Sequence, residues 1–475
     1  MYMRMCSLLG WMLVGAATAC GQTVPRSPGS PVGRQPVTAV PHDAPARQPG
    51  TPASPASRSV PPVSPPTASG ADAAPVPEDI VTTVELAPEA WPEIRDDLGD
   101  LGDSNADGST DLVAAIDRQL AWFRTHGADK VWRLGGEDYT AADMVASLRL
   151  FRRTWQAHHR DPAALRRALV RDFRLFRVES NGSPDILFSG YYAPIYRGSR
   201  TRSQRFRHPL YRAPEDLVRI RPGLFDERFL QPGHALRTAH VFARHDRASG
   251  EIVPYYTREE IDKQRVLAGR GLEVAYLERY FDVVTLHIQG SGYVELEDGG
   301  FLQLNFAAGN HRGYRAIGRI LVEEGAIAPD ALSMQAIDAY FTAHPEDIER
   351  VCFMNPSYVF FSASEARKRL TPDLYPHGMF GFPLTTRRSI ATDKRWFPGG
   401  GLAFMAGRQR HADGTSTPFS GFAIDQDTGG GIRNGHIDIF LGIGAEAGEN
   451  AGRMRDREGR LYILIARGAV PRAGQ

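Results

Sequence analysis

The stretch GFAIDQDTGGGIRNGHIDIFLG, residues 421–442, gathers three aspartates around a run of glycines. Its second half, GHIDIFLG, alternates as a β-strand does, with successive side chains on opposite faces. The two faces carry Ile437, Ile439 and Leu441 on one side and His436, Asp438 and Phe440 on the other. A carboxylate among apolar groups is costly to bury, so this strand points to a site with a chemical purpose.

Two interpretations of these acids stay open from the residues alone. Burial raises the pKa of a carboxyl and keeps it protonated near neutrality, as a general acid requires. Asp427 would raise the pKa of Asp438 further if their two strands pair. In the other interpretation, Asp427 caps a turn and Asp438 accepts hydrogen bonds from backbone amides.

Other chemistries find less support in the same residues. Asp427-Thr428-Gly429 is the tripeptide of aspartic proteases, but those enzymes need two such loops and the chain has no second DTG or DSG. No HExxH and no paired Cys/His spacing indicates a metal site. GGGIRNG lacks the strand–GxxxxGK[ST]–helix context of a phosphate loop.

Composition places the chain among soluble globular proteins. Its 475 residues favour two domains, and 42% hydrophobic and 23% charged residues are ordinary values. The net charge of +1 gives no support to a nucleic-acid partner.

The N-terminus reads as an export signal over residues 1–19, with one arginine before a short apolar core. Cys20 then resembles the lipid-accepting cysteine of a bacterial lipobox, although Ala17 stands where leucine is preferred. The alternative is release after Ala19. Residues 20–78 are rich in Pro, Ala, Ser and Thr and predict a disordered tether.

Several elements follow from periodicity. Helices are predicted at 111–123, from the N-cap Thr140, at 314–325 ending at Gly325, and from Asp330 at 329–341. A strand is predicted at 185–199, leading into a turn. Another is predicted within 281–296; it ends at a turn, Gly290-Ser291-Gly292, which would present Gln289 at its lip. From about Gly381 short strands separated by Gly and Pro, without a long helix, indicate a small barrel.

The three cysteines, Cys6, Cys20 and Cys352, predict no structural disulfide. Cys6 leaves with the signal and Cys20 is lipidated if the lipobox is used. Cys352 is expected to be a buried, small apolar residue.

Six segments, taken in order, resemble the MltA-type membrane-bound lytic transglycosylases, which cleave bacterial peptidoglycan. The resemblance runs from about Val81 to Ala469, and the segments are FSGYYAPIY, LHIQGSG, MNPSYVFF, FPLTTRRSIATD, DTGGGIRNGHIDIFLGIG and AGRMRDREGRLYILI. Its 3D signature of three aspartates falls on Asp393, Asp427 and Asp438. Asp425 is extra to that pattern and receives no role.

The resemblance implies a mainly β fold with helices, of the α+β class. A double-psi β-barrel with N-terminal helices would be assembled from residues 79–195 and 376–472. A second, mixed β domain, 196–375, would be inserted between them, and the substrate groove would run between the domains. Residues 197–250 and 407–420 are longer than expected for the family and would alter the groove.

The resemblance also implies the chemistry. Asp438 would protonate the oxygen that links MurNAc to GlcNAc and then take the proton of the C6 hydroxyl, which closes a 1,6-anhydroMurNAc end without water. Asp427 would orient or tune Asp438, and Asp393 would support the site. This scheme needs no cofactor and no metal.

Five residues are expected at the glycan by the same resemblance: Gln289, Ser189, Gly190, Tyr191 and Tyr192. Ser189 stands where threonine is expected, and the two tyrosines are as well suited to core packing as to stacking on sugars. The partners would be peptidoglycan glycan strands, the membrane through a lipid on Cys20, and candidate proteins of cell-wall synthesis.

The location implied is the periplasmic face of the outer membrane, or the soluble periplasm after cleavage at Ala19. The alternative function is a non-catalytic double-psi barrel that binds glycan and loosens the wall, and a water-using hydrolase is a third option. The hydrolase differs from a lytic transglycosylase in its product, and the binding protein would leave the glycan uncleaved.

Overall fold

The computed structural model describes residues 81–468, apart from 99–107, 128–129, 227, 229–240, 330, 368–373 and 412. The predicted signal peptide 1–19, the lipidation site Cys20 and the tether 20–78 lie outside the described residues. No helix in the described part of the chain is long and apolar enough to cross a membrane.

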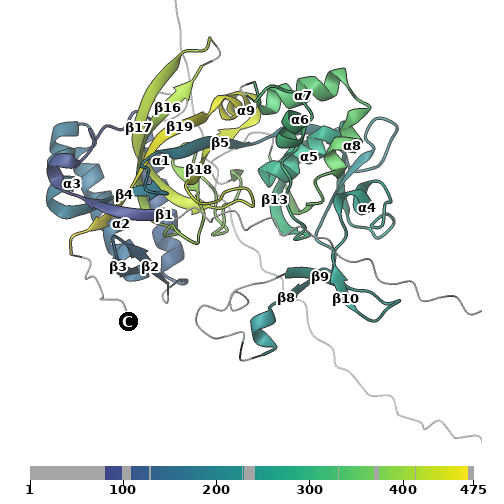
Figure 1. Cartoon of the computed structure of the whole chain (residues 1–475), viewed down its shortest axis with the longest axis horizontal. Coiled ribbons are helices and arrows are strands. Elements are labelled where there is room, and N and C mark those ends of the chain that lie inside the picture. The colour runs from purple at the N-terminus through teal and green to yellow at the C-terminus, as the bar shows by residue number, and fades with distance from the viewer. Residues whose placement is uncertain are drawn as a thin grey trace, which may run out of the picture. The chain divides into compact units, whose positions relative to one another are not determined.

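An eight-stranded sheet is built mostly from the C-terminal part of the chain (Figure 1). Its strands, in spatial order, are β1 (Val81–Leu86), β4 (Phe173–Ser180), β19 (Arg455–Ala466), β16 (Leu402–Arg410), β17 (Ser416–Asp427), β15 (Ser389–Ala391), β18 (His436–Ile443) and β5 (Ile186–Ala193). Strand β5 also pairs with β19, so β19, β16, β17, β15, β18 and β5 form a closed ring. The ring thus joins one strand near residue 190 to five strands after residue 388.

The predicted alternation of β18 is confirmed. Ile437, Ile439 and Leu441 belong to the large core of the ring. Phe440, on the other face, packs in a separate small cluster with Tyr191. The two faces of this strand therefore meet two different environments, and Asp438 lies on the face away from the large core.

Helices cover part of this sheet. They are α1 (Gly108–Phe123), α2 (Ala141–His158), α3 (Pro162–Asp172) and, between β18 and β19, α9 (Gly444–Arg453), with the hairpin β2 (Val131–Leu134) and β3 (Glu137–Thr140) and a 3-10 turn at Pro88–Ala90. The predicted N-cap is confirmed, because the Thr140 hydroxyl accepts from the Asp143 amide and the Asp143 carboxylate accepts from the Thr140 amide. Helix α9 was not expected among these strands.

A six-stranded sheet is built from the middle of the chain. Its order is β14 (Val359–Glu365), β13 (Phe301–Gly309), β12 (Ser291–Leu296), β6 (Ile195–Ser199), β11 (Glu273–Leu277) and β7 (His208–Tyr211). Its helices are α4 (Arg258–Asp262), α5 (Tyr280–Gln289), α6 (Ile317–Glu323), α7 (Met334–Ala343) and α8 (Asp347–Phe353). A small sheet holds β8 (Val218–Ile220), β9 (Val241–His245) and β10 (Ile252–Pro254), and a 3-10 turn spans Pro222–Leu224.

Two predicted elements of the middle segment are wrong. Residues 280–289 form helix α5 and not a strand, and the strand β12 begins only at Ser291. Helix α7 begins at Met334, because the Ser333 hydroxyl accepts from the Ala336 amide as its N-cap, and not at Asp330. Helix α6 does end before Gly325, whose φ of 73° is left-handed, as predicted.

The predicted mixture of strands and helices is confirmed. The double-psi topology, the boundaries at 195/196 and 375/376 and the groove stay predictions. Cys352 is a free, buried thiol, as expected. The segment 407–420 extends the β16–β17 hairpin, where Arg410 pairs with Ser416.

Candidate active site

Asp427 and Asp438 lie on either side of the short strand β15. Ala391 is the register partner of Asp427 in β17, which runs parallel to β15, and of Asp438 in β18, which runs antiparallel. Strands β17 and β18 therefore do not pair directly, because β15 lies between them. The two acids are nevertheless close enough that the Asp427 charge raises the pKa of Asp438.

Asp438 has the chemistry of a general acid. Burial raises the pKa of its carboxyl to about 7, and the Asp427 charge adds to the shift. The Ser189 hydroxyl, 2.8 Å from Asp438 Oδ1, opposes the shift because it can donate to the carboxylate. Ser189 is opposite Asp438 in the parallel β5–β18 pair, which fixes this contact.

Asp427 is held by the turn that follows β17. Burial raises the pKa of Asp427 to about 6, against hydrogen bonds from the Tyr191 hydroxyl and the Thr428 and Met379 amides. The Tyr191 hydroxyl donates to Asp427 Oδ2 at 2.7 Å. The turn-capping interpretation thus describes Asp427 well, while Asp438 is bonded by a side chain.

Asp393 does not join the other two acids. It is buried, forms an ion pair with Arg395 at 2.7 Å, and its Oδ2 accepts from the Asn434 amide at 2.9 Å. Burial would raise the pKa of Asp393, but these hydrogen bonds lower it below its usual value. Asp393 thereby fixes the turn at Asn434, with its left-handed φ of 54°, just before β18 begins.

Asp425, which had no predicted role, is paired with Lys394. The Lys394 ammonium contacts Asp425 Oδ1, and both groups bond the Thr392 hydroxyl at 2.8 Å. Burial raises the pKa of Asp425 against this pairing and lowers that of Lys394. The Lys394 charge also lowers the pKa of Asp427, so this pair influences the titration of an acid of the candidate site.

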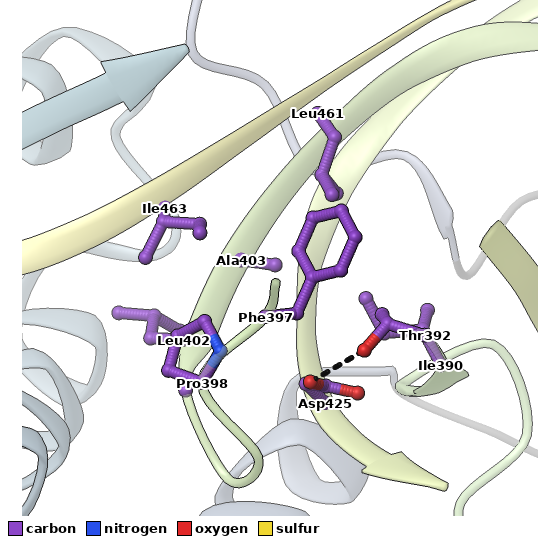
Figure 2. Close-up of a pocket in the computed structure, with 10 residues that line it drawn as sticks. Ile390, Thr392, Phe397, Pro398, Leu402, Ala403, Asp425, Leu461 and Ile463 are labelled. Atoms are coloured by element: carbon purple, nitrogen blue, oxygen red, sulfur yellow. Dashed lines mark hydrogen bonds between the residues drawn. The ribbon is translucent and has the colours of Figure 1, made fainter. Parts of the chain in front are cut away.

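A small cavity lies beside Asp425 inside the ring (Figure 2). Apart from Asp425 and Thr392, which are joined by the hydrogen bond drawn in Figure 2, its lining is apolar. Its residues are Ile390, Thr392, Phe397, Pro398, Gly401, Leu402, Ala403, Asp425, Leu461 and Ile463. A sugar needs more hydrogen-bond partners than this lining offers, so the cavity is a packing defect of the core.

Three of the residues expected at the glycan lie in different surroundings: at the end of a helix, buried beside an acid, and half-buried against α9. Gln289 is the last residue of α5, and its Oε1 accepts from the Tyr192 amide at 3.1 Å, which ties α5 to β5. Tyr191 is buried against Phe440, with its hydroxyl on Asp427. Tyr192 is half-buried against α9.

Gly190 is required by packing. A Cβ at this position would lie 2.5 Å from Leu441 Cδ1 and 3.1 Å from the backbone of Ala451 in α9. Only glycine lets α9 approach β5 so closely.

Two residues beside the acids were missed by the sequence analysis. His436 Nε2 lies 2.6 Å from the Ser189 hydroxyl oxygen, and Lys394 pairs with Asp425. His436 could have been found, because it shares a strand face with Asp438. Among the described residues, no group of three or more His, Cys, Asp or Glu side chains could hold a metal ion.

Comparison with known proteins matches two segments of the chain to described families. Residues 187–362 match the MltA specific insert domain, and residues 388–465 match the 3D domain. The second segment contains Asp393, Asp427 and Asp438, and the first contains Ser189 and Gln289.

The curated relatives share one name. The membrane-bound lytic murein transglycosylase A of Vibrio cholerae is 28% identical over 317 residues, which are 65% of this chain and 73% of the relative. The protein of that name from Escherichia coli K12 is 28% identical over 287 residues, 59% of this chain and 66% of the relative.

Solved structures share the fold. A membrane-bound lytic murein transglycosylase from Agrobacterium tumefaciens matches with a TM-score of 0.63 and 29% identity, over 81% of this chain and 98% of that one. MltA from Neisseria gonorrhoeae matches with a TM-score of 0.53 and 28% identity, over 74% and 98%. By these segments, relatives and folds, the chain belongs to the MltA-type lytic transglycosylases.

Proposed function

We propose that the chain is a peptidoglycan lytic transglycosylase that cleaves the MurNAc-β-1,4-GlcNAc bond and leaves a 1,6-anhydroMurNAc end. The observation that carries the proposal is the surroundings of Asp438: its half-buried carboxyl has the Ser189 hydroxyl 2.8 Å away and Asp427 as its charged neighbour, and burial raises its pKa to about 7. Such a group is protonated in a useful fraction of molecules at neutral pH and can also be ionised without large cost.

One carboxyl then serves both halves of the reaction. Asp438 gives its proton to the glycosidic oxygen while the bond from C1 to that oxygen breaks, with positive charge developing on the MurNAc ring. The ionised Asp438 next takes the proton of the C6 hydroxyl as that oxygen bonds to C1. Asp438 ends protonated again, and no water is consumed. The nucleophile belongs to the substrate, so no second catalytic carboxylate is required, unlike in most glycosidases.

The other acids support this role. Asp427, ionised and held by Tyr191, raises the pKa of Asp438 and so favours its acid form. Asp393 acts from a distance by fixing the turn that leads into β18. We assign to both acids positioning roles.

The glycan would lie in a groove between a double-psi barrel, 79–195 with 376–472, and the inserted domain, 196–375. Gln289 supports this location because it bonds the backbone of β5 beside the acids and comes from a helix of the inserted part. Ser189, Gly190, Tyr191 and Tyr192 would shape the wall of that groove. We further propose that Cys20 carries a lipid that anchors the protein to the outer membrane, facing the periplasm.

The test is mass spectrometry of purified peptidoglycan digested by the full-length protein, with Asp438→Asn in parallel. The expected fragments end in 1,6-anhydroMurNAc and are lighter by one water than hydrolysis products. They should be absent with Asp438→Asn and present with Asp413→Asn, an exposed acid at the β16–β17 turn that serves as the charge-matched control.

Each other result has a definite meaning. Reducing MurNAc ends would make the protein a hydrolase. Intact glycan that retains the protein would favour the binding function. Cleavage that survives in Asp438→Asn would mean that another group is the acid.

A further inference from the structure

A single hydroxyl lies between Asp438 and His436. The Ser189 oxygen is 2.8 Å from Asp438 Oδ1 and 2.6 Å from His436 Nε2. His436 precedes Asp438 by two residues on β18, so both side chains face Ser189 on the neighbouring strand β5. A serine hydroxyl has one proton and cannot donate to both neighbours at once.

The other side of the imidazole decides which neighbour receives that proton. The Gly431 backbone forms a hydrogen bond with His436 that raises the pKa of the imidazole, as a carbonyl does when a ring N–H donates to it. Because Nε2 faces Ser189, Nδ1 is the ring nitrogen available to donate to Gly431. Burial nevertheless lowers the pKa of His436 overall. A neutral ring with its proton on Nδ1 presents a bare Nε2, which can only accept from Ser189.

We propose that His436 is a positioning residue that draws the Ser189 proton toward itself and thereby selects the acid form of Asp438. When Ser189 donates to His436, its oxygen can only accept from Asp438, so the proton of that contact must be on Asp438. After Asp438 has delivered its proton, the Ser189 hydroxyl turns and donates to the carboxylate. The inference rests on the proposed function for the role of Asp438 as the acid.

The remaining charged and titratable groups around Asp438 have other partners or lie at the surface. On the neighbouring strands and the turn after β15 these groups are Tyr191 on β5, Asp425 and Asp427 on β17, Lys394 after β15 and Arg455 on β19. Tyr191 bonds Asp427, Lys394 pairs with Asp425, and Arg455 is exposed. Within the described residues, the hydrogen bond to Asp438 therefore comes from Ser189.

The direct test measures the pKa of Asp438 in the full-length protein by NMR with aspartate labelled with 13C at Cγ. Loss of a resonance in Asp438→Asn assigns it. In His436→Leu, Ser189 is free to donate to the carboxylate at all times, so we expect the pKa of Asp438 to fall by about one unit. The alkaline limb of kcat/KM should move to lower pH by the same amount. His436→Gln keeps an acceptor and should restore most of the wild-type value.

The route through Ser189 is tested by a double variant. In Ser189→Ala, adding His436→Leu should produce no further shift in the pKa of Asp438, because the connecting hydroxyl is gone. The control is His411→Leu, which removes an exposed imidazole whose Nε2 lies 2.7 Å from the Thr417 hydroxyl. This pair resembles the one at the site but lies at the end of the hairpin, so the pKa of Asp438 should not move.

A measurement on the wild-type protein tests the proposal even if the variants fail to fold. NMR of wild-type protein with 15N-labelled histidine should show His436 neutral at pH 7 with its proton on Nδ1. A proton on Nε2, an unchanged pKa of Asp438 in His436→Leu, or an equal shift in the Ser189→Ala background would each overturn the proposal. None of these titrations requires cleavage, so a wild-type protein without lytic products would refute the proposed function separately.

Discussion

Two acids in this chain have raised pKa values for the same reason and yet are placed for opposite purposes. Burial raises the pKa of Asp262, in α4, to about 6 and that of Asp438, in β18, to about 7. Asp262 accepts from the Tyr280 hydroxyl at 2.6 Å and the Tyr358 hydroxyl at 3.1 Å, with the buried Arg258 guanidinium 3.9 Å away.

Asp438, in contrast, has one hydroxyl beside it and an acid instead of a cation as its charged neighbour. The difference shows that a raised pKa does not by itself mark a site. Each carboxylate oxygen of Asp262 accepts a hydrogen bond from a tyrosine, and the Arg258 cation balances its charge, which is the pattern of a structural network. Asp438 keeps bonding capacity open for a substrate.

The largest effect should separate the two acids by activity. Asp438→Asn removes the transferable proton and should reduce lytic activity by at least about 100-fold while the fold is retained. Asp262→Asn should leave the activity per folded molecule within about twofold of wild type. Release of soluble glycan fragments, corrected for the folded fraction by circular dichroism, measures both. Equal losses of activity in the two variants would mean that Asp262 and Asp438 do not differ in function.

In contrast to activity, the free energy of unfolding should depend on Asp262 more than on Asp438. Asp262→Asn leaves the Arg258 charge buried without its partner, and we expect it to lower the free energy of unfolding by about 3 kcal/mol. Denaturant unfolding at pH 7 measures this change. Asp413→Asn at the exposed hairpin turn should leave the free energy of unfolding without a measurable change. If Asp262→Asn is also neutral, the network around Arg258 contributes no stability.

The Lys394–Asp425 pair extends the comparison into the ring. Lys394→Met leaves Asp425 buried without its cation and should lower the free energy of unfolding by about 2 kcal/mol, because Lys394 itself is partly exposed. Adding Asp425→Asn should recover most of the loss. Lys263→Met, which breaks an exposed pair with Glu259, should leave the free energy of unfolding without a measurable change. A larger loss in the double variant than in Lys394→Met would contradict this account.

The smallest effect is a dependence of stability on pH. The folded-state pKa of Asp438 is above its value in the unfolded chain, so the stability contributed by its protonated form is complete below about pH 4 and is lost as the pH rises through about 7. Asparagine does not titrate. The Tm of Asp438→Asn minus that of wild type should therefore rise by a few degrees between pH 4 and 7 and then level off. Scanning calorimetry across that range gives the answer, and a flat difference would mean that the pKa is not raised.

The site was easier to predict than the middle segment, and the physical reason lies in burial. Strand β18 meets two different environments, so its alternation was visible in the sequence. Helix α5 is buried on nearly every side from Tyr280 to His287, so it shows no helical period, and its β-branched residues imitated a strand.

The contacts between distant segments were beyond sequence reasoning. The pattern could mark His436 and Asp438 as neighbours on one strand, but not bring Ser189 beside them, because that depends on the register of β5 against β18. Likewise the insertion of β15 between the two acids follows from ring topology and not from their spacing.

The distance in the chain between β5 and β18 determines how much of the polypeptide must be made before the proposed active site can form. Ser189 and Asp438 are separated by 249 positions in the chain, and the pair cannot meet until β18 has joined β5. Contacts so distant form late, since a long loop must be closed before they repay its entropy. A chain that ends before β18 lacks Asp438, so under the proposed mechanism it is unable to cleave glycan until β18 has been made and has joined β5.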